Sequence, residues 1–285
     1  MAPTTRRRVA QVPATVIDAS GAHLATERLA GEEPLEIRVA VPGGAVIWTT
    51  ATMRTPGQDF ALAAGLLHAE GVLANPGDLA EIRYCTEVDE QQFNVVTVHL
   101  RRPPRREPVA RSLGATASCG VCGTSSIDEV LARVPAIAVT DEVTVDGSLL
   151  AALPDRLRAA QPVFEATGGL HAAGLFDTSG RAVGVAEDIG RHNALDKVLG
   201  ERFLAGGLPA TDTIAVVSSR VSFELVQKVA AAGVPVLCAV SAPSTLAVET
   251  ARRLGVTLAA FARGDRVTLY AHPERVRVEQ PARPV

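Results

Sequence analysis

The stretch that decides the fold runs from residue 213 to residue 270 and alternates short apolar runs with helical segments. The apolar runs are TIAVVS at Thr213–Ser218, VPVLCAV at Val234–Val240, VTLAAF at Val256–Phe261 and VTLY at Val267–Tyr270. Between the first three lie Ser222–Ala232 and Ser244–Leu254, which have apolar residues at helical spacing, and a glycine follows each segment. Continuous apolar strands separated by helices are typical of parallel pairing with both sheet faces covered. The sequence therefore predicts an α/β domain here.

The N-terminal third predicts a smaller α+β unit. Strand-like runs and one helical segment alternate there, at Leu35–Val41, Ala45–Thr50, Asp59–Glu70 (the helix) and Phe93–Leu100. We expect a loose, disordered tail over residues 1–14, a small α+β domain over 15–108 and the α/β domain over 109–285.

An arginine- and proline-rich segment separates the two predicted domains. From Arg101 to Arg111, five arginines against Glu107 give a charge of 5 − 1 = +4. Proline lacks the N–H that a sheet needs and like charges repel, so this segment ends the first sheet. It is either a solvated linker or a basic collar beside an anionic ligand.

Composition excludes several classes of protein. The 285 residues include 28 Lys+Arg and 31 Asp+Glu, for a net charge of −3, and 47% are hydrophobic. This balance excludes a wholly disordered chain and lacks the basic excess of a nucleic-acid binder. The basic triplet Arg6–Arg8 is not followed by an apolar signal region, and no apolar run is long enough for a membrane span. We expect a cytoplasmic protein, and we interpret the presence of only two lysines, Lys197 and Lys228, as compositional bias.

The predicted strands end in polar segments that fit an anion. Ser218-Ser219-Arg220 follows the first strand, residues 241–244 follow the second, and Phe261–Arg266 closes the third. Ligands of open α/β sheets bind at the carboxyl ends of the strands, where helix N-termini and arginines favour phosphate. The pattern therefore predicts a phosphate-bearing ligand, although turn and capping chemistry explains the serines equally well. Neither a G-x-G-x-x-G nor a P-loop fingerprint is present.

Two upstream clusters are ambiguous. His171 lies in the glycine-rich stretch 167–174 and is either a hydrogen-bonded core histidine or a ligand contact. Arg191, His192 and Asn193 begin a predicted short helix and indicate a ligand or interface surface.

Two of the four cysteines form a C-x-x-C pair, Cys119 and Cys122, in a loop rich in small residues just before a predicted helix. Exposed amides and a helix dipole stabilise the reactive thiolate. Three interpretations remain open: half of a zinc site, a thioredoxin-like redox pair, or a sulfur carrier that holds a persulfide. A zinc deaminase site is excluded because His171-Ala172-Ala173 lacks the required glutamate. We expect Cys85 and Cys238 to be buried small hydrophobes, and no structural metal.

Taken together, these pieces resemble the FdhD/NarQ family of formate dehydrogenase accessory sulfurtransferases. The matching stretches are Glu33–Ile37, Met53–Gly57, Gly65–Leu67 with Glu70-Gly71, Cys119–Gly123, Thr167–Ala173, Glu187–Lys197, Ser218–Arg220 and Phe261–Arg266.

The resemblance implies a function, a site and a topology. A cysteine desulfurase would pass sulfur to Cys119 as a persulfide, with Cys122 as the second thiol. The sulfur would then reach molybdenum bis(molybdopterin guanine dinucleotide), a bound substrate, for formate dehydrogenase. The resemblance also implies a cytidine-deaminase-like C-terminal domain and a homodimer. The alternative is a non-catalytic chaperone that shelters the cofactor. The residues expected to contact the guanine-nucleotide-containing cofactor are Phe261, Ala262, Arg263, Gly264, Asp265, Arg266, Ser218, Ser219, Arg220 and His171.

Overall fold

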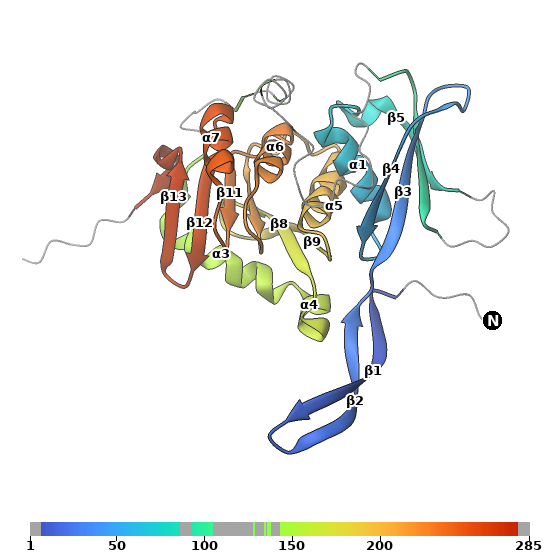
Figure 1. Ribbon diagram of the computed structural model, residues 1–285. Coiled ribbons are helices and arrows are strands. Elements are labelled where there is room, and N and C mark those ends of the chain that lie inside the picture. Colours follow the sequence, from blue (N-terminus) through green and yellow to red (C-terminus); the bar gives the residue numbers. More distant parts are fainter. Residues whose placement is uncertain are drawn as a thin grey trace, which may run out of the picture.

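The computed structural model describes residues 7–85, 93–104, 128, 134, 136–137 and 143–278. Its largest sheet has six strands in the order β13-β12-β11-β10-β8-β9, which confirms the α/β prediction (Figure 1). The strands are β8 (His171–Asp177), β9 (Ala182–Asp188), β10 (Thr213–Val217), β11 (Val236–Ala239), β12 (Thr257–Arg263) and β13 (Arg266–Ala271).

The sheet is mixed, and the parallel pairing predicted for the three strands that helices separate is confirmed. Strands β10, β11 and β12 are parallel, as predicted. Strand β13 is antiparallel to β12, and β8 is antiparallel to both β10 and β9. Two residues, Gly264 and Asp265, connect β12 to β13, whereas a parallel crossover needs a dozen or more. The short connection therefore dictates the antiparallel direction.

Helices cover both faces of this sheet. Helix α3 (Gly147–Ala159) lies on one face, and α5 (Arg191–Leu204), α6 (Phe223–Ala231) and α7 (Thr245–Leu254) lie on the other (Figure 1). Alternate strand residues point to opposite faces, so Leu237 packs in the α5–α7 core while Cys238 packs under α3. The predicted helix starting at Arg191 is longer than expected, and its predicted apolar positions are buried. The short helix α4 (Pro162–Thr167) follows α3.

The smaller unit is a four-stranded sheet in the order β4-β3-β6-β5, with α1 (Asp59–Ala69) on one face. Each predicted strand and the predicted helix are confirmed, with β5 additional. The strands are β3 (Glu33–Ala40), β4 (Val46–Arg54), β5 (Leu79–Tyr84) and β6 (Val95–Leu100), with the 3-10 turn η1 (Pro76–Asp78) before β5. The chain's tryptophan, Trp48, is buried between this sheet and α1.

Helices α1 and α5 join the two units at very close range. A Cβ atom on Gly65 would collide with the backbone carbonyl of Asp196, and one on Gly200 would collide with that of Ala61. Only glycine permits this approach of two helix backbones. The molecule is thus layered as α3, the six-stranded sheet, α5–α7, α1 and the four-stranded sheet (Figure 1).

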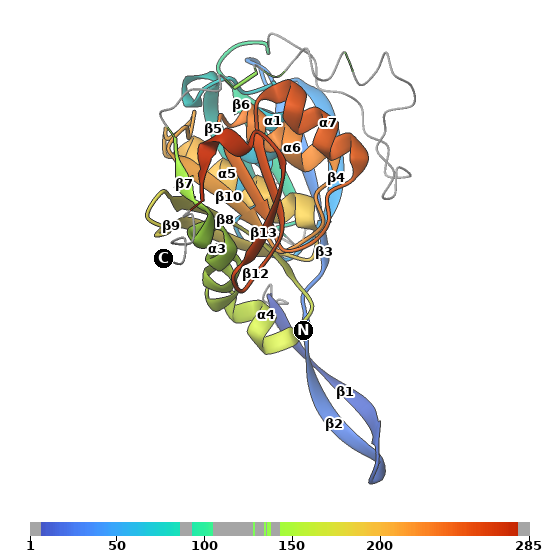
Figure 2. The ribbon, with the colours of Figure 1, turned by 90° about the vertical axis from the view of Figure 1, so that its left-hand side faces the viewer.

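A two-stranded ribbon, β1 (Val9–Asp18) and β2 (Gly21–Ala30), projects from the body near α4 (Figures 1 and 2). The expectation of a loose tail over residues 1–14 is therefore wrong for Val9–Ala14, which pair with Ala25–Ala30. Hydrophobic periodicity could not detect these strands, because a ribbon with both faces in solvent does not need an apolar face.

Short elements complete the fold. Strands β7 (Val145–Asp146) and β14 (Val276–Arg277) pair in parallel, and η2 (Pro273–Arg275) precedes β14. The predicted domain boundary at 108/109 lies outside the described residues. Within the described ranges, the structure contains no helix with the length and apolar character needed to cross a bilayer.

Candidate functional site

The carboxyl ends of β10, β11 and β12 lie at one edge of the large sheet, and the loops that follow them are hydrogen-bonded together. The backbone N–H of Val221 donates to the carbonyl of Ala242 at 3.0 Å, and that of Phe261 donates to Ser241 at 3.4 Å. Because β8 is antiparallel to β10, its first residue, His171, lies at this same edge. The structure therefore brings together segments that are far apart in sequence. The ligand edge, as we name it, comprises His171, Ser218–Arg220 and Phe261–Arg266.

The turn between β12 and β13 holds two arginines side by side. Arg263 and Arg266 are opposite each other in the antiparallel register, with Gly264 and Asp265 forming the turn. Gly264 has φ +62°, a conformation that favours glycine at the first position of such a turn. Both arginines are exposed, and neither has an ion-pair partner among the described residues. Like charges placed directly opposite repel each other, so a bound anion would stabilise this turn.

Phe261 has an unusual backbone conformation at the same edge. Its φ is +52°, its side chain is 44% exposed, and the register shifts between Ala260 and Arg263 as in a β-bulge. A bulky residue in this region is strained, and such strain clusters at ligand sites. The neighbouring Ala262 side chain is buried in the core, so only its backbone could meet a ligand.

The two serines of the ligand edge stabilise the loop itself. The Ser218 hydroxyl oxygen accepts from the backbone N–H of Ala172 at 2.9 Å, and the Ser219 hydroxyl donates to the carbonyl of Arg220 at 2.9 Å. Turn chemistry therefore accounts for both side chains. Arg220 is exposed without an ion-pair partner in the described chain, and Ser222, the N-cap residue of α6, makes no side-chain hydrogen bond to the first amides of the helix. The arginine and these amides are the groups left for an anion.

His171 is half-buried and adjacent to charged groups. Burial, followed by the positive charge of Arg191, lowers the pKa of His171, and Asp188 opposes the shift. The imidazole is therefore neutral at pH 7. It can donate or accept a hydrogen bond with a ligand, but it does not attract an anion by charge. The Arg191 Nε atom is buried and has no hydrogen-bond partner within the described ranges. Of the three residues at the start of α5, Arg191 is thus the one best placed for a ligand.

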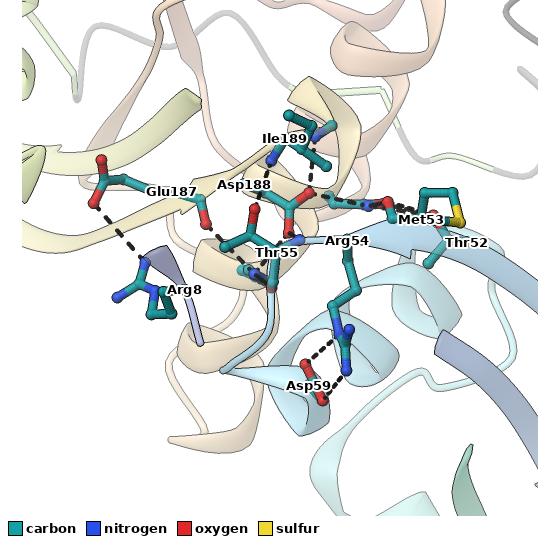
Figure 3. A network of polar contacts seen from close by, with 12 residues as sticks. Arg8, Thr52, Met53, Arg54, Thr55, Asp59, Glu187, Asp188 and Ile189 are labelled. Atoms are coloured by element: carbon teal, nitrogen blue, oxygen red, sulfur yellow. Dashed lines mark hydrogen bonds and ion pairs between the residues drawn. The ribbon is translucent and has the colours of Figure 1, made fainter. Parts of the chain in front are cut away.

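The long motif Glu187–Lys197 mainly joins the two units of the fold. Lys197 Nζ lies 2.7 Å from Asp188 Oδ2, and the backbone N–H of Thr55 donates to the same oxygen at 3.1 Å (Figure 3). Asn193 Nδ2 donates to the Met53 carbonyl at 2.7 Å, and Lys197 Nζ donates to the Thr55 carbonyl at 2.8 Å. The segment after β4 is therefore fixed to the end of β9 by a buried polar network. Asn193, predicted on a ligand or interface surface, is an internal contact.

Both lysines are buried in ion pairs. Lys197 pairs with Asp188, and Lys228 pairs with Asp196 at 2.6 Å. Burial lowers the pKa of Lys197, an effect that the charge of Asp188 opposes. The interpretation of the two lysines as compositional bias is thus incomplete, because each has a structural partner. His192 Nε2, at the start of α5, lies 3.1 Å from Glu224 Oε2 and 3.2 Å from the Ser222 hydroxyl. Sequence spacing did not indicate Ser222 or Glu224.

The predicted cysteine site lies outside the described residues, because Cys119 and Cys122 both fall in the range 105–127. Cys238 is fully buried, as expected, and burial raises the pKa of its thiol to about 12. Cys85 is only half-buried, so the expectation for it was too strong. Arg102, at the start of the arginine-rich segment, pairs with Asp78 at 2.6 Å. In the part of the chain that the structure describes, no three His, Cys, Asp or Glu side chains gather as a metal site.

The fold and the ligand edge define a class of protein: an α/β protein of two units, with exposed arginines at the edge where the parallel strands of its larger sheet end. The profile of the FdhD/NarQ family matches residues 30–277, and the chain belongs to this family. It is 46% identical over 278 residues to the sulfur carrier protein FdhD of Nocardia farcinica, covering 96% of this chain and 95% of that protein. It is 50% identical over 258 residues to the FdhD of Streptomyces coelicolor, covering 88% and 89%.

A solved structure shares the fold. The crystal structure of a candidate formate dehydrogenase accessory protein from Desulfotalea psychrophila superposes with a TM-score of 0.75 and 24% identity. The match covers 95% of this chain and all of that one, so both units and their joint belong to a common architecture.

Proposed function

We propose that this protein is a sulfur carrier that accepts sulfur as a persulfide on Cys119 and delivers it to molybdenum bis(molybdopterin guanine dinucleotide) for formate dehydrogenase. Family membership and the relatives that are named sulfur carriers support the sulfur chemistry. The observation that carries the cofactor part is the pair Arg263 and Arg266, exposed and opposite each other without ion-pair partners within the described chain. This pair suits a ligand with two or more phosphates.

The proposed loading step is a thiol exchange. The Cys119 thiolate attacks the terminal sulfur of a persulfide on a cysteine desulfurase. The desulfurase S–S bond breaks, its cysteine leaves as a thiolate, and a new S–S bond forms on Cys119. We propose that this exchange takes place in the cytoplasm, where thiols are kept reduced.

The proposed delivery step uses Cys122. Its thiolate attacks Cys119 Sγ and displaces the outer sulfur as sulfide, which becomes a ligand of the bound molybdenum. The two thiols are oxidised to a disulfide while the outer sulfur is reduced by two electrons. A cellular dithiol reductant then restores both thiols. The cofactor is a substrate in this scheme, and the ligand edge only has to hold its phosphates.

The loading step is tested by incubating the protein with a desulfurase and cysteine. Mass spectrometry should find one added sulfur on the Cys119 peptide, and none in Cys119→Ala. The variant Cys122→Ala should load normally but retain its sulfur, because the displacing thiol is missing. An unmodified Cys119 peptide, or sulfur that persists elsewhere in Cys119→Ala, would contradict the proposal.

The cofactor site is tested with a guanine nucleotide as the probe. Replacing Arg263 and Arg266 with alanine should weaken its binding by about 100-fold or more, because hydrogen bonds to charged groups contribute roughly 1.5–3 kcal/mol each and two arginines are removed. Arg83→Ala, an exposed arginine on β5, is the matched control. Unchanged affinity in the double variant would place the phosphates elsewhere.

Complementation separates sulfur transfer from the chaperone alternative. In cells lacking the endogenous carrier, Cys119→Ala should keep nucleotide binding but yield inactive formate dehydrogenase. Active enzyme with Cys119→Ala would favour a protein that only shelters the cofactor.

The cytidine-deaminase-like topology expected for the C-terminal domain stays part of this proposal. The mixed six-stranded sheet and its covering helices are compatible with it.

A further inference from the structure

Arg191 is a cation that the fold leaves without a partner next to the ligand edge. Its side chain makes no hydrogen bond or ion pair with any described residue, although its Nε atom is buried. Native structures rarely bury a polar atom in this way, because the lost hydration is not replaced. The residue is partly exposed, so a ligand can reach the terminal nitrogens of the guanidinium. Arg191 therefore has unused hydrogen-bond donors in a partly desolvated place.

The position of Arg191 in helix α5 is electrostatically unfavourable. It is the first residue of the helix, where the unpaired backbone amides carry a partial positive charge. Arg202, in the last turn of the same helix, also has a buried Nε atom without a partner in the described chain. The helix dipole stabilises the cation at Arg202, whereas it opposes the cation at Arg191. A residue that breaks a local rule without an internal compensation is expected at a functional site.

Two carboxylates near the start of α5 are committed to other partners. Asp188, at the end of β9, pairs with Lys197 and accepts three further hydrogen bonds (Figure 3). Glu224, at the start of α6, lies 3.1 Å from His192 Nε2. Neither carboxylate pairs with Arg191, yet both would repel a phosphate that approached it. The group that best fits Arg191 is therefore an uncharged hydrogen-bond acceptor.

The two ends of the ligand edge differ in exposure. Arg263 and Arg266 are exposed at the turn after β12, whereas Arg191 is partly buried beside β8, whose first residue, His171, is opposite Asp188. Three strand spacings of about 4.8 Å separate β12 from β8, or roughly 14 Å in all. This span suits a nucleoside diphosphate extended along the edge. The exposed arginines then meet the phosphates, and Arg191 meets the base.

We infer that Arg191 selects the guanine base of the bound nucleotide, with the terminal nitrogens of its guanidinium donating to the O6 and N7 atoms of the base. This inference rests on the proposed function, in which the ligand contains a guanine nucleotide. Guanine presents these two acceptors side by side, whereas adenine has an amino donor in place of O6. The planar fork of donors in arginine matches the guanine pair and opposes the amino group of adenine. Arg191 thus supplies a selectivity that phosphate contacts cannot give.

The test compares the binding of GDP and ADP to the full chain by titration calorimetry. The wild-type protein should bind GDP about 5- to 150-fold more tightly than ADP, the range that one bidentate pair provides. Arg191→Met should abolish this preference by weakening GDP without weakening ADP, because the two nucleotides share their phosphates. Arg202→Met is the matched control, since Arg202 lies at the other end of α5. It should bind both nucleotides as the wild type does.

A GDP analogue with a C–H group in place of N7 tests the contact even if the variant does not fold. It should bind the wild type about 10-fold more weakly than GDP, because one hydrogen bond to a charged group is lost. In Arg191→Met, the analogue and GDP should bind equally.

Equal affinities of the wild type for GDP and ADP would overturn the inference. An equal loss of both nucleotides in Arg191→Met would also overturn it and would assign Arg191 to the phosphates. In both cases the proposed cofactor site would stand, because GDP still binds the wild type. A wild type that binds neither nucleotide would instead contradict the cofactor part of the proposed function, and this inference with it.

Discussion

The ion pair between Asp188 and Lys197 is the residue-scale feature with the largest expected effect. Both side chains are essentially inaccessible to solvent. Lys197→Met leaves a buried carboxylate without its cation, which costs about 3–5 kcal/mol of unfolding free energy. Chemical denaturation should show this loss.

The exposed pair between Arg253 and Asp128 provides the comparison for this prediction. Arg253→Met should cost less than about 1 kcal/mol, since surface pairs contribute little. Equal losses in the two variants would mean that burial does not determine the strength of the pair.

His171 should make stability depend on pH. Its pKa is lowered by burial and by Arg191, so below about pH 6.5 the unfolded chain binds a proton that the folded chain does not. Stability attributable to this histidine is therefore present at pH 7 and falls as the pH drops through about 6.5. His171→Gln should remove this component. Unfolding free energies of the wild type and the variant are compared at pH 7.5 and pH 5.5, and the wild type should lose more stability between them. Equal losses in the two proteins would contradict a lowered pKa of His171.

At the scale of secondary-structure elements, the crossing of α1 and α5 depends on two glycines. Gly65→Ala should destabilise the protein by more than about 2 kcal/mol, because its Cβ would overlap the Asp196 backbone and force the helices apart. Gly169→Ala is the control, since a Cβ there meets no atom closer than the Cβ of Ala30, at an ordinary 3.5 Å. Thermal unfolding of the two variants tests this contrast. A stable Gly65→Ala protein would mean that the helices separate at little cost.

Periodicity predicted the elements that have a buried face. The apolar runs at β10–β12 and the helical spacing of α6 and α7 indicate both their type and their bounds within a few residues. The ribbon escaped prediction because neither of its faces is buried. The direction of β13 was not predicted, because strand composition does not encode pairing direction, whereas the two-residue turn does.

The grouping of the strand-end segments at one edge of the sheet could be predicted, but their detailed contacts could not. The rule that ligands bind at the carboxyl ends of strands correctly grouped Ser218–Arg220 with Phe261–Arg266. It could not show that Ser218 and Ser219 are committed to backbone hydrogen bonds, or that Phe261 has a positive φ. These depend on contacts between distant segments. Arg191, His192 and Asn193 were predicted to form a ligand or interface surface, because buried contacts between two units and binding sites both use polar and charged side chains.

At the scale of the whole molecule, the two units should unfold together. The Gly65–Gly200 crossing and the buried network around Asp188 tie the four-stranded sheet to the six-stranded sheet. Trp48, the only tryptophan, reports on the small unit, while far-UV circular dichroism reports on the whole chain. Both signals should give the same midpoint, in a single calorimetric transition. An earlier loss of tryptophan fluorescence would show that the small unit unfolds first.

The burial of both lysines has a practical consequence for anyone who handles this protein. Apart from the α-amino group, the native chain presents no reactive primary amine, because Lys197 and Lys228 are its only lysines and both are enclosed. Succinimidyl dyes and amine-coupled sensor surfaces will therefore find no lysine to attach to while the fold persists. Labelling of either lysine requires the interior to open, so the rate of lysine modification measures the rate at which the protein unfolds.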